Sequence, residues 1–106
     1  MDAQMKRGLM EACVLSLLLK GDSYGYLLIQ EVSALMPISE STLYPVLRRL
    51  QKDTCLETYD REFGGRNRRY YKLTEIGRAK LKWYELEWRQ YSEKVTGLFE
   101  GGIVHE

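Results

Sequence analysis

Two stretches of this 106-residue chain concentrate side chains that bind bases and phosphates. In the first, residues 39–52, short hydroxyl groups precede cations, and its polar members are Ser39, Ser41, Thr42, Tyr44, Arg48, Arg49 and Lys52. In the second, between Arg61 and Lys72, basic residues face a single acid, Glu62, although the net charge of the chain is only +1. Hydroxyl and guanidinium groups hydrogen-bond to base edges and phosphate oxygens. Both stretches are therefore candidates for nucleic-acid contact.

The other reactive residue types form no catalytic or metal-binding pattern. The single histidine, His105, is one residue from the end of the sequence and is expected in a tail. Cys13 and Cys55 are too few for a structural zinc site and are predicted to be reduced core thiols. A glycine-rich phosphate loop is also missing from the sequence. We predict that the chain is not an enzyme and binds no cofactor or metal.

Length and composition favour one globular unit. The sequence contains no linker-like segment or repeat that would divide it. Its longest apolar run, residues 13–19, is interrupted by Ser16 and is far shorter than a membrane span of about 20 residues. No secretion-signal pattern is present at the start. We expect a cytoplasmic protein without a membrane partner.

Apolar spacing and capping residues predict two helices in the first third of the chain. The first spans about residues 5–19 and ends near Gly21. The second spans about residues 24–36, with Ser23 as its cap and Pro37 forcing its end.

A third helix is predicted from a cap at Ser39 to about Lys52. Its apolar face consists of Leu43, Val46, Leu47 and Leu50. Pro45 interrupts it, and an interior proline costs about 3 kcal/mol because it removes a backbone hydrogen bond. Helical angles place Pro45 opposite the apolar face, where the freed carbonyl stays in water and the cost falls. The exposed side of this helix is therefore expected to meet a polar partner.

The last third of the chain predicts a hairpin and a long helix. The strands are Leu56–Phe63 and Arg68–Leu73, joined by a flexible basic tip at residues 64–67, with Tyr71 and Leu73 pointing inward. Thr74 is expected to cap a helix over residues 75–98 that ends at the Gly101-Gly102 pair.

The final helix carries two apolar stripes. The first, expected to pack on its own domain, is Ile76, Ala79, Trp83 and Leu86. The second, expected to form an interface with another copy, is Tyr84, Trp88, Tyr91, Val95 and Leu98. Trp88, with Glu85 one turn earlier, is also a candidate platform for a planar cation.

This order of elements is that of a winged helix-turn-helix, an α+β and mostly helical fold. We expect residues 1–74 to form the DNA-binding unit, residues 75–100 a dimerisation helix packed on it, and residues 101–106 a tail. The third helix would enter the DNA major groove and the hairpin, or wing, would contact phosphates. The predicted DNA contacts are Ser39, Ser41, Thr42, Tyr44, Arg48, Arg49, Lys52, Gly64, Gly65, Arg66, Arg68 and Arg69.

Three segments in this order resemble the PadR family of bacterial transcriptional regulators, over about residues 8–77. They are "GDSYGYLLIQEV", "ISESTLYPVLRRLQKD" and "GGRNRRYYKLTEIGRAKL". The resemblance implies a homodimeric, usually repressing protein that binds a palindromic operator through Ser41, Thr42, Tyr44, Arg48, Arg66, Arg68 and Arg69. The single final helix resembles the compact subgroup, some of whose members bind planar drugs against a tryptophan, here Trp88.

The sequence departs from the family pattern at two positions. Thr54 stands where the family commonly has glycine after the recognition helix, at a place where glycine easily adopts positive φ. This departure leaves open how that helix ends and where the wing lies. Ser41 replaces a frequent glycine, so its hydroxyl is either an added DNA contact or part of the helix cap.

Two other functions remain open from the sequence. The first is a small-molecule sensor or carrier that uses the aromatic residues of the last helix. The second is a winged-helix module for protein contacts, since this fold does not guarantee DNA binding.

Overall fold

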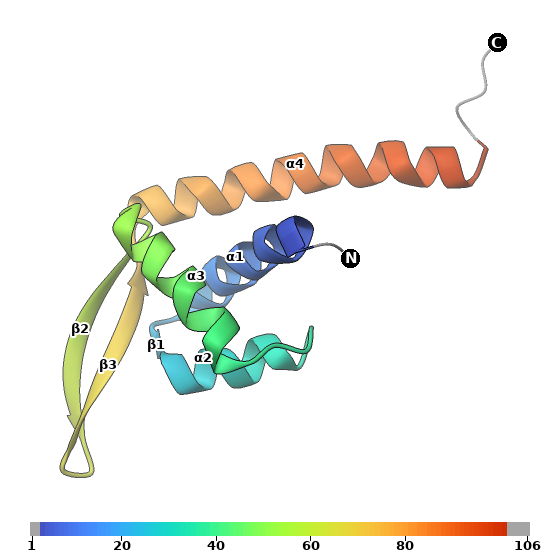
Figure 1. The fold of residues 1–106 in the computed structure, drawn as a ribbon. Coiled ribbons are helices and arrows are strands. Elements are labelled where there is room, and N and C mark those ends of the chain that lie inside the picture. The colour runs from blue at the N-terminus through green and yellow to red at the C-terminus, as the bar shows by residue number, and fades with distance from the viewer. Residues whose placement is uncertain (1–2, 102–106) are drawn as a thin grey trace.

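The computed structural model describes residues 3–101, so His105 and Gly102 lie outside the described residues. Its elements, in order, are α1 (Ala3–Lys20), β1 (Ser23–Tyr24), α2 (Gly25–Ser33), α3 (Glu40–Lys52), β2 (Leu56–Phe63), β3 (Arg66–Leu73) and α4 (Glu75–Phe99) (Figure 1). Three helices, a hairpin and a final helix follow one another as the sequence predicts.

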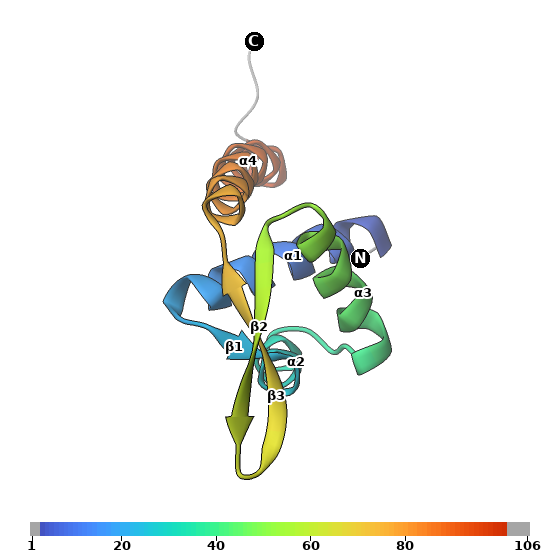
Figure 2. The ribbon, with the colours of Figure 1, turned by 90° about the vertical axis from the view of Figure 1, so that its left-hand side faces the viewer.

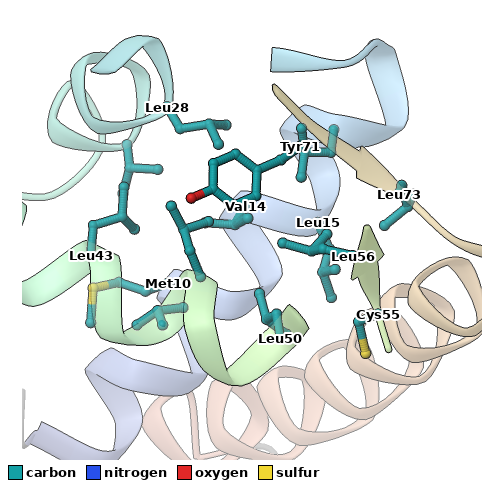
Figure 3. Close-up of a cluster of buried hydrophobic side chains, with 14 residues drawn as sticks. Met10, Val14, Leu15, Leu28, Leu43, Leu50, Cys55, Leu56, Tyr71 and Leu73 are labelled. Carbon is teal, nitrogen blue, oxygen red and sulfur yellow. The ribbon is translucent and has the colours of Figure 1, made fainter. Parts of the chain in front are cut away.

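One apolar core joins the first three helices to the base of the hairpin. Fully buried side chains come from α1, α2, α3 and β2, among them Val14, Leu15, Leu28, Leu43, Leu47, Leu50 and Leu56 (Figure 3). Tyr71 and Leu73 of β3 close the core from the sheet side, which confirms their predicted inward orientation. Cys55 is buried in this core, whereas Cys13 is half-buried, and both are free thiols.

The start and end of the second helix differ from the prediction. Ser23 is not a helix cap, because Ser23 and Tyr24 form a short strand that pairs with Tyr71 and Tyr70 of β3. This pairing keeps their backbone extended, so α2 begins only at Gly25. The helix ends at Ser33 rather than at residue 36, and a turn leads to Pro37, which disfavours helical backbone in the residue before it.

The third helix matches the prediction closely. Ser39 occupies the N-cap position, and its carbonyl accepts hydrogen bonds from the backbone N–H groups of Thr42 and Leu43. Its hydroxyl does not cap the helix and instead contacts the Ser41 hydroxyl at 2.9 Å. Pro45 is exposed, opposite the buried stripe. Water can therefore reach the carbonyl that Pro45 leaves unpaired.

Thr54 ends α3 in the conformation that glycine usually supplies, with φ of 61°. The backbone N–H of Cys55 donates to the Leu50 carbonyl at 2.9 Å, and that of Thr54 donates to the Gln51 carbonyl at 3.0 Å. These two bonds define a Schellman motif. The helix thus ends as it would with glycine, despite the β-branched side chain.

The hairpin tip is shorter than predicted. Arg66 and Asn67 belong to β3, Phe63 pairs with Arg66, and only Gly64 and Gly65 form the turn. Their φ values of 59° and 81° are those of a two-residue hairpin turn whose twist matches the strands. The sheet has the strand order β1-β3-β2.

The long helix begins as predicted, but the stripe that packs on the domain is not the predicted one. The Thr74 hydroxyl accepts a hydrogen bond from the backbone N–H of Gly77 at 3.0 Å. Gly77 is buried against the Cys55 carbonyl, where a β-carbon would not fit.

The stripe that packs on the domain continues from Gly77 through Leu81 to Tyr84. The stripe predicted to pack there, Ile76, Ala79, Trp83 and Leu86, is exposed. That prediction was wrong because the close approach at Gly77 sets the rotation of the helix.

The C-terminal part of α4 projects away from the rest of the chain (Figure 1). The radius of gyration is 16.6 Å, whereas a compact chain of this length has about 13 Å. Of the residues that the structure describes, none forms a helix long and apolar enough to cross a membrane.

Candidate nucleic-acid interface

The solvent face of α3 presents hydroxyl groups at its start and cations at its end. Ser39, Ser41 and Thr42 are exposed, and the Ser39 hydroxyl lies 2.9 Å from that of Ser41 and 3.2 Å from that of Thr42. Arg48 and Lys52 are exposed further along the same helix. The buried stripe of Leu43, Val46, Leu47 and Leu50 holds this face outward. It offers hydrogen-bonding groups and positive charge to a partner.

Tyr44 is half-buried against the core rather than free in solvent. Its hydroxyl lies so close to Gly25 that a β-carbon there would be 2.8 Å from it. Glycine at the start of α2 therefore makes room for this ring. Tyr44 is available for outside contact only through its exposed edge.

Arg49 is turned away from the solvent face of α3. Its Nη2 and Nε atoms lie 2.9 Å and 3.0 Å from Oε2 of Glu11 in α1. The ion pair gives this guanidinium a partner inside the molecule, and the DNA contact of Arg49 stays a prediction.

The hairpin carries further exposed members of the predicted DNA contacts. Gly64, Gly65, Arg66 and Arg69 are all exposed. Arg69 lies 3.7 Å from Asp60 across the strands, in an exposed and therefore weak pair. The tip and the start of α3 both lie on the side away from α4 in the two views (Figures 1 and 2). One side of the molecule thus gathers the hydroxyls of α3 and the cations of the hairpin.

Arg68 has a different environment from its neighbours. Its guanidinium carbon lies 4.0 Å from the ring centre of Tyr24 and 4.2 Å from that of Phe63. Arginine held between two aromatic faces is stabilised by cation–π attraction. Arg68 therefore ties the hairpin to β1, a role that the sequence alone did not suggest.

Three tyrosine rings, one from each strand, pack against one another on the sheet. The rings of Tyr59 and Tyr70 stack at 5.5 Å, and Tyr70 meets Tyr24 edge to face at 5.6 Å. The Tyr59 hydroxyl donates a 2.7 Å hydrogen bond to Asp22, which raises the pKa of Tyr59. Tyr70 thus packs within the sheet.

Glu11 is a buried acid that sequence reasoning missed. It is 5% exposed and receives contacts from Arg49, from Lys80 at 3.3 Å and from the Tyr84 hydroxyl. Burial alone raises the pKa of a carboxyl group, but hydrogen bonds from Tyr84 and Arg49 and the charge of Lys80 outweigh it and lower the pKa of Glu11. The available clue was that Glu11 is the single charged residue within residues 8–19.

A groove of about 570 Å³ lies between α1 and α4. Its walls include Leu9 and Cys13 from α1 and Tyr84, Trp88 and Tyr91 from α4. Glu85 also lines it, so the structure brings both predicted ligand residues, Trp88 and Glu85, to one apolar groove. Burial raises the pKa of the Cys13 thiol, which favours its neutral form.

Three helices followed by a hairpin, with a hydroxyl-bearing third helix held on a packed core, define a winged helix-turn-helix protein. The fold class predicted from the sequence is confirmed, and such proteins place the third helix in the DNA major groove.

The family follows from comparison with known proteins. The profile of the "Transcriptional regulator PadR-like family" matches residues 14–83. This chain belongs to that family of DNA-binding transcriptional regulators.

Solved structures and curated relatives agree with this assignment. The structure of smu.1704 from Streptococcus mutans UA159 is 41% identical with a TM-score of 0.87, covering 94% of each chain. A PadR-like transcriptional regulator, BC4206 from Bacillus cereus, is 30% identical with a TM-score of 0.82, covering 92% of this chain and 97% of that one. The transcriptional regulator Rv3488 of Mycobacterium tuberculosis is 40% identical over 68 residues, which are 64% of this chain and 60% of the relative.

Proposed function

We propose that this protein is a homodimeric repressor that binds a two-fold symmetric operator through the solvent face of α3 and the tip of the hairpin. The observation that carries the proposal is that hydroxyls and unpaired cations meet on one side of the molecule. Arg48 and Arg66 are exposed and have no ion-pair partner among the residues of the described range.

The proposed contacts divide by chemistry. Ser41, Thr42 and the exposed edge of Tyr44 lie at the start of α3, where a recognition helix meets base edges. Arg48, Lys52, Arg66 and Arg69 supply positive charge for phosphates. The glycines at the tip allow the hairpin backbone to approach the duplex closely. Ser39 contributes mainly by orienting the hydroxyls of Ser41 and Thr42.

The salt dependence of operator binding tests this division. Each phosphate contact contributes about 0.9 to the slope of log affinity against log salt. Because a homodimer presents each arginine twice, we expect Arg48→Ala and Arg66→Ala each to flatten the slope by about 1.8. Arg89→Ala on α4, which removes the same charge far from the proposed surface, should leave the slope unchanged. Operator fragments are obtained by selection from genomic DNA, and equal slopes in all four proteins would contradict the proposed contacts.

Homodimer formation is supported by the spacing of residues on α4. Gly77, Leu81, Tyr84, Trp88, Tyr91, Val95 and Leu98 recur every four and three residues, as in a coiled-coil seam. The first part of this seam packs on the domain, but Trp88, Tyr91 and Leu98 are 55%, 59% and 64% exposed. Soluble proteins rarely leave such a surface bare, and a second copy of α4 has the complementary seam.

A planar aromatic cation is the second candidate partner, as an effector that releases DNA. The α1–α4 groove favours it because aromatic rings of Trp88, Tyr84 and Tyr91 line the walls and the carboxylates of Glu85 and Glu87 supply negative charge. In a Trp83→Phe background, fluorescence reports Trp88 alone. We expect a planar quaternary ammonium compound to quench this emission and to weaken operator binding. Unchanged emission at millimolar compound would contradict an effector site at Trp88.

A further inference from the structure

The two oxygens of the Glu11 carboxylate are divided between two helices. Oε2 accepts a hydrogen bond from Nε of Arg49, on the recognition helix α3, and lies 2.9 Å from Nη2 of the same guanidinium. Oε1 accepts from the Tyr84 hydroxyl and faces Lys80 at 3.3 Å, both on α4. Each of the two helices thus contacts a different oxygen of the same buried carboxylate.

This acid provides the side-chain link between α3 and α4 next to the core. Both helices pack on α1, which carries Glu11, and contact between α3 and α4 themselves is slight. A buried carboxylate holds its partners strongly because a charge left unpaired in the interior is costly. Moving either helix away from α1 would therefore expose Glu11 or leave one of its oxygens without a partner.

A second attachment lies at the start of α4. The Thr74 hydroxyl donates to the Thr54 carbonyl at 2.6 Å, and the Thr74 backbone N–H donates to the Cys55 carbonyl at 3.1 Å. Gly77 then packs on the same Cys55 carbonyl. These contacts fix the beginning of α4 just behind the end of α3 and form a pivot.

With a pivot at residues 74–77, the contact at Tyr84 sets the direction of α4. The helix extends from Gly77 to Phe99, a length of about 33 Å at 1.5 Å per residue. A rotation of about 10° about the pivot would move its far end by about 6 Å. Small changes at Tyr84 therefore become large displacements at the exposed end of the helix (Figure 1).

We propose that Glu11 is a positioning residue and that its hydrogen bond with Tyr84 acts as a latch fixing the angle between α4 and the DNA-binding unit. This inference rests on the homodimer of the proposed function. If two protomers join through α4, that angle sets the separation of their recognition helices. Symmetric readers need a defined separation, about 34 Å for successive major grooves on one face of DNA. The latch thus determines which half-site spacing the dimer accepts.

The variant Tyr84→Phe tests the latch because it removes only the hydroxyl and keeps the ring in the core contact. Tyr26→Phe is the matched control, since Tyr26 is 61% exposed and lies on α2, outside the seam of α4. We would measure affinity for a series of operators whose half-site separation changes by one base pair at a time. The wild type and Tyr26→Phe should share one sharp optimum. Tyr84→Phe should lose roughly tenfold affinity at that optimum and show a broader or displaced profile.

Amide hydrogen exchange of the DNA-free full chain provides the second measurement. The latch predicts exchange roughly tenfold faster or more across residues 78–90 in Tyr84→Phe, with no change in Tyr26→Phe. An unchanged spacing profile together with unchanged exchange would overturn the latch. If the wild type binds DNA without any spacing preference, or binds none, the dimeric repressor fails instead. In that case the amide hydrogen exchange of Tyr84→Phe alone decides whether the contact between Glu11 and Tyr84 fixes the position of α4.

Discussion

At the scale of single residues, the least expected feature is a buried charged side chain next to the apolar core. Glu11 is buried together with the Nη2 atom of Arg49 and next to Lys80, whose side chain is 29% exposed. Removing a carboxylate from water is costly, but here hydrogen-bond donors from two other helices replace that water. Glu11 is stable in its charged form because its partners compensate for its burial.

Because of this arrangement, Glu11 contributes to the free energy of unfolding at neutral pH and loses that contribution in acid. The pKa of Glu11 is lower in the folded chain than its usual value of 4.5, since hydrogen bonds from Tyr84 and Arg49 and the charge of Lys80 outweigh burial. A carboxyl group whose pKa is lower in the folded chain stabilises the fold at pH values above its pKa in the unfolded chain. This contribution is lost as the pH falls through the pKa of the folded chain. Glu11→Gln should therefore be about 2 kcal/mol less stable at pH 7. Urea unfolding should show this difference narrowing below about pH 4.5. An equal difference at pH 7 and pH 3 would contradict the assignment.

At the scale of elements, capping residues in the sequence predicted the starts of α3 and α4 but not the start of α2. Ser39 and Thr74 each precede a helix as predicted. The start of α2 was misplaced because strand pairing with β3 fixes Ser23 and Tyr24 in extended form. No local pattern indicates that pairing, since Tyr71 is 48 positions after Ser23 in the sequence.

The end of α3 combines a favourable hydrogen-bond pattern with an unfavourable residue. Thr54 has φ of 61°, a region that costs a residue with a β-carbon about 1–2 kcal/mol. Its hydroxyl recovers part of this cost by donating to the Asp53 carbonyl at 2.6 Å. The Schellman bonds therefore hold Thr54 in a conformation that its own side chain opposes.

Thr54→Gly should stabilise the fold. Glycine removes the backbone strain while keeping both Schellman hydrogen bonds, although its greater freedom in the unfolded chain offsets part of the gain. We expect a net increase of about 0.5–1 kcal/mol and a melting temperature several degrees higher. Thermal unfolding monitored by circular dichroism checks this, with Thr58→Gly in β2 as a control that should destabilise. A lower melting temperature for Thr54→Gly would show that the hydroxyl contact outweighs the strain.

At the scale of the whole molecule, the sequence predicted the fold and the exposed faces of α3 and the hairpin, but not the rotation of α4. The spacing of apolar residues identifies stripes without saying which stripe meets the domain. Gly77 decides the matter because only a glycine allows the helix to approach the Cys55 carbonyl. Arg49 shows the same limit, since no local pattern in the sequence indicates its ion pair with Glu11 of α1.

The correct rotation places the domain contact and the free seam on one continuous face of α4. Tyr84 ends the part that packs internally, and Trp88 and Tyr91 begin the exposed part. The α1–α4 groove lies along this boundary. The proposed dimer contact, the candidate effector groove and the latch at Glu11 therefore share neighbouring residues, which couples partner binding to the direction of α4.

A charge placed in the free seam should separate the proposed dimer without unfolding the domain. Tyr91 is 59% exposed in the single chain, so Tyr91→Glu leaves the core intact but would bury an unpaired carboxylate between two copies. We expect its dimer dissociation constant to rise by about a hundredfold, equivalent to about 2.7 kcal/mol. Gln90→Glu adds the same charge at an exposed neighbouring position outside the seam and should remain dimeric. Sedimentation equilibrium distinguishes a 12.4 kDa monomer from a particle of twice that mass. If the wild type sediments as a monomer, or if Tyr91→Glu associates as tightly as Gln90→Glu, the seam is not the dimer contact and another partner must cover α4.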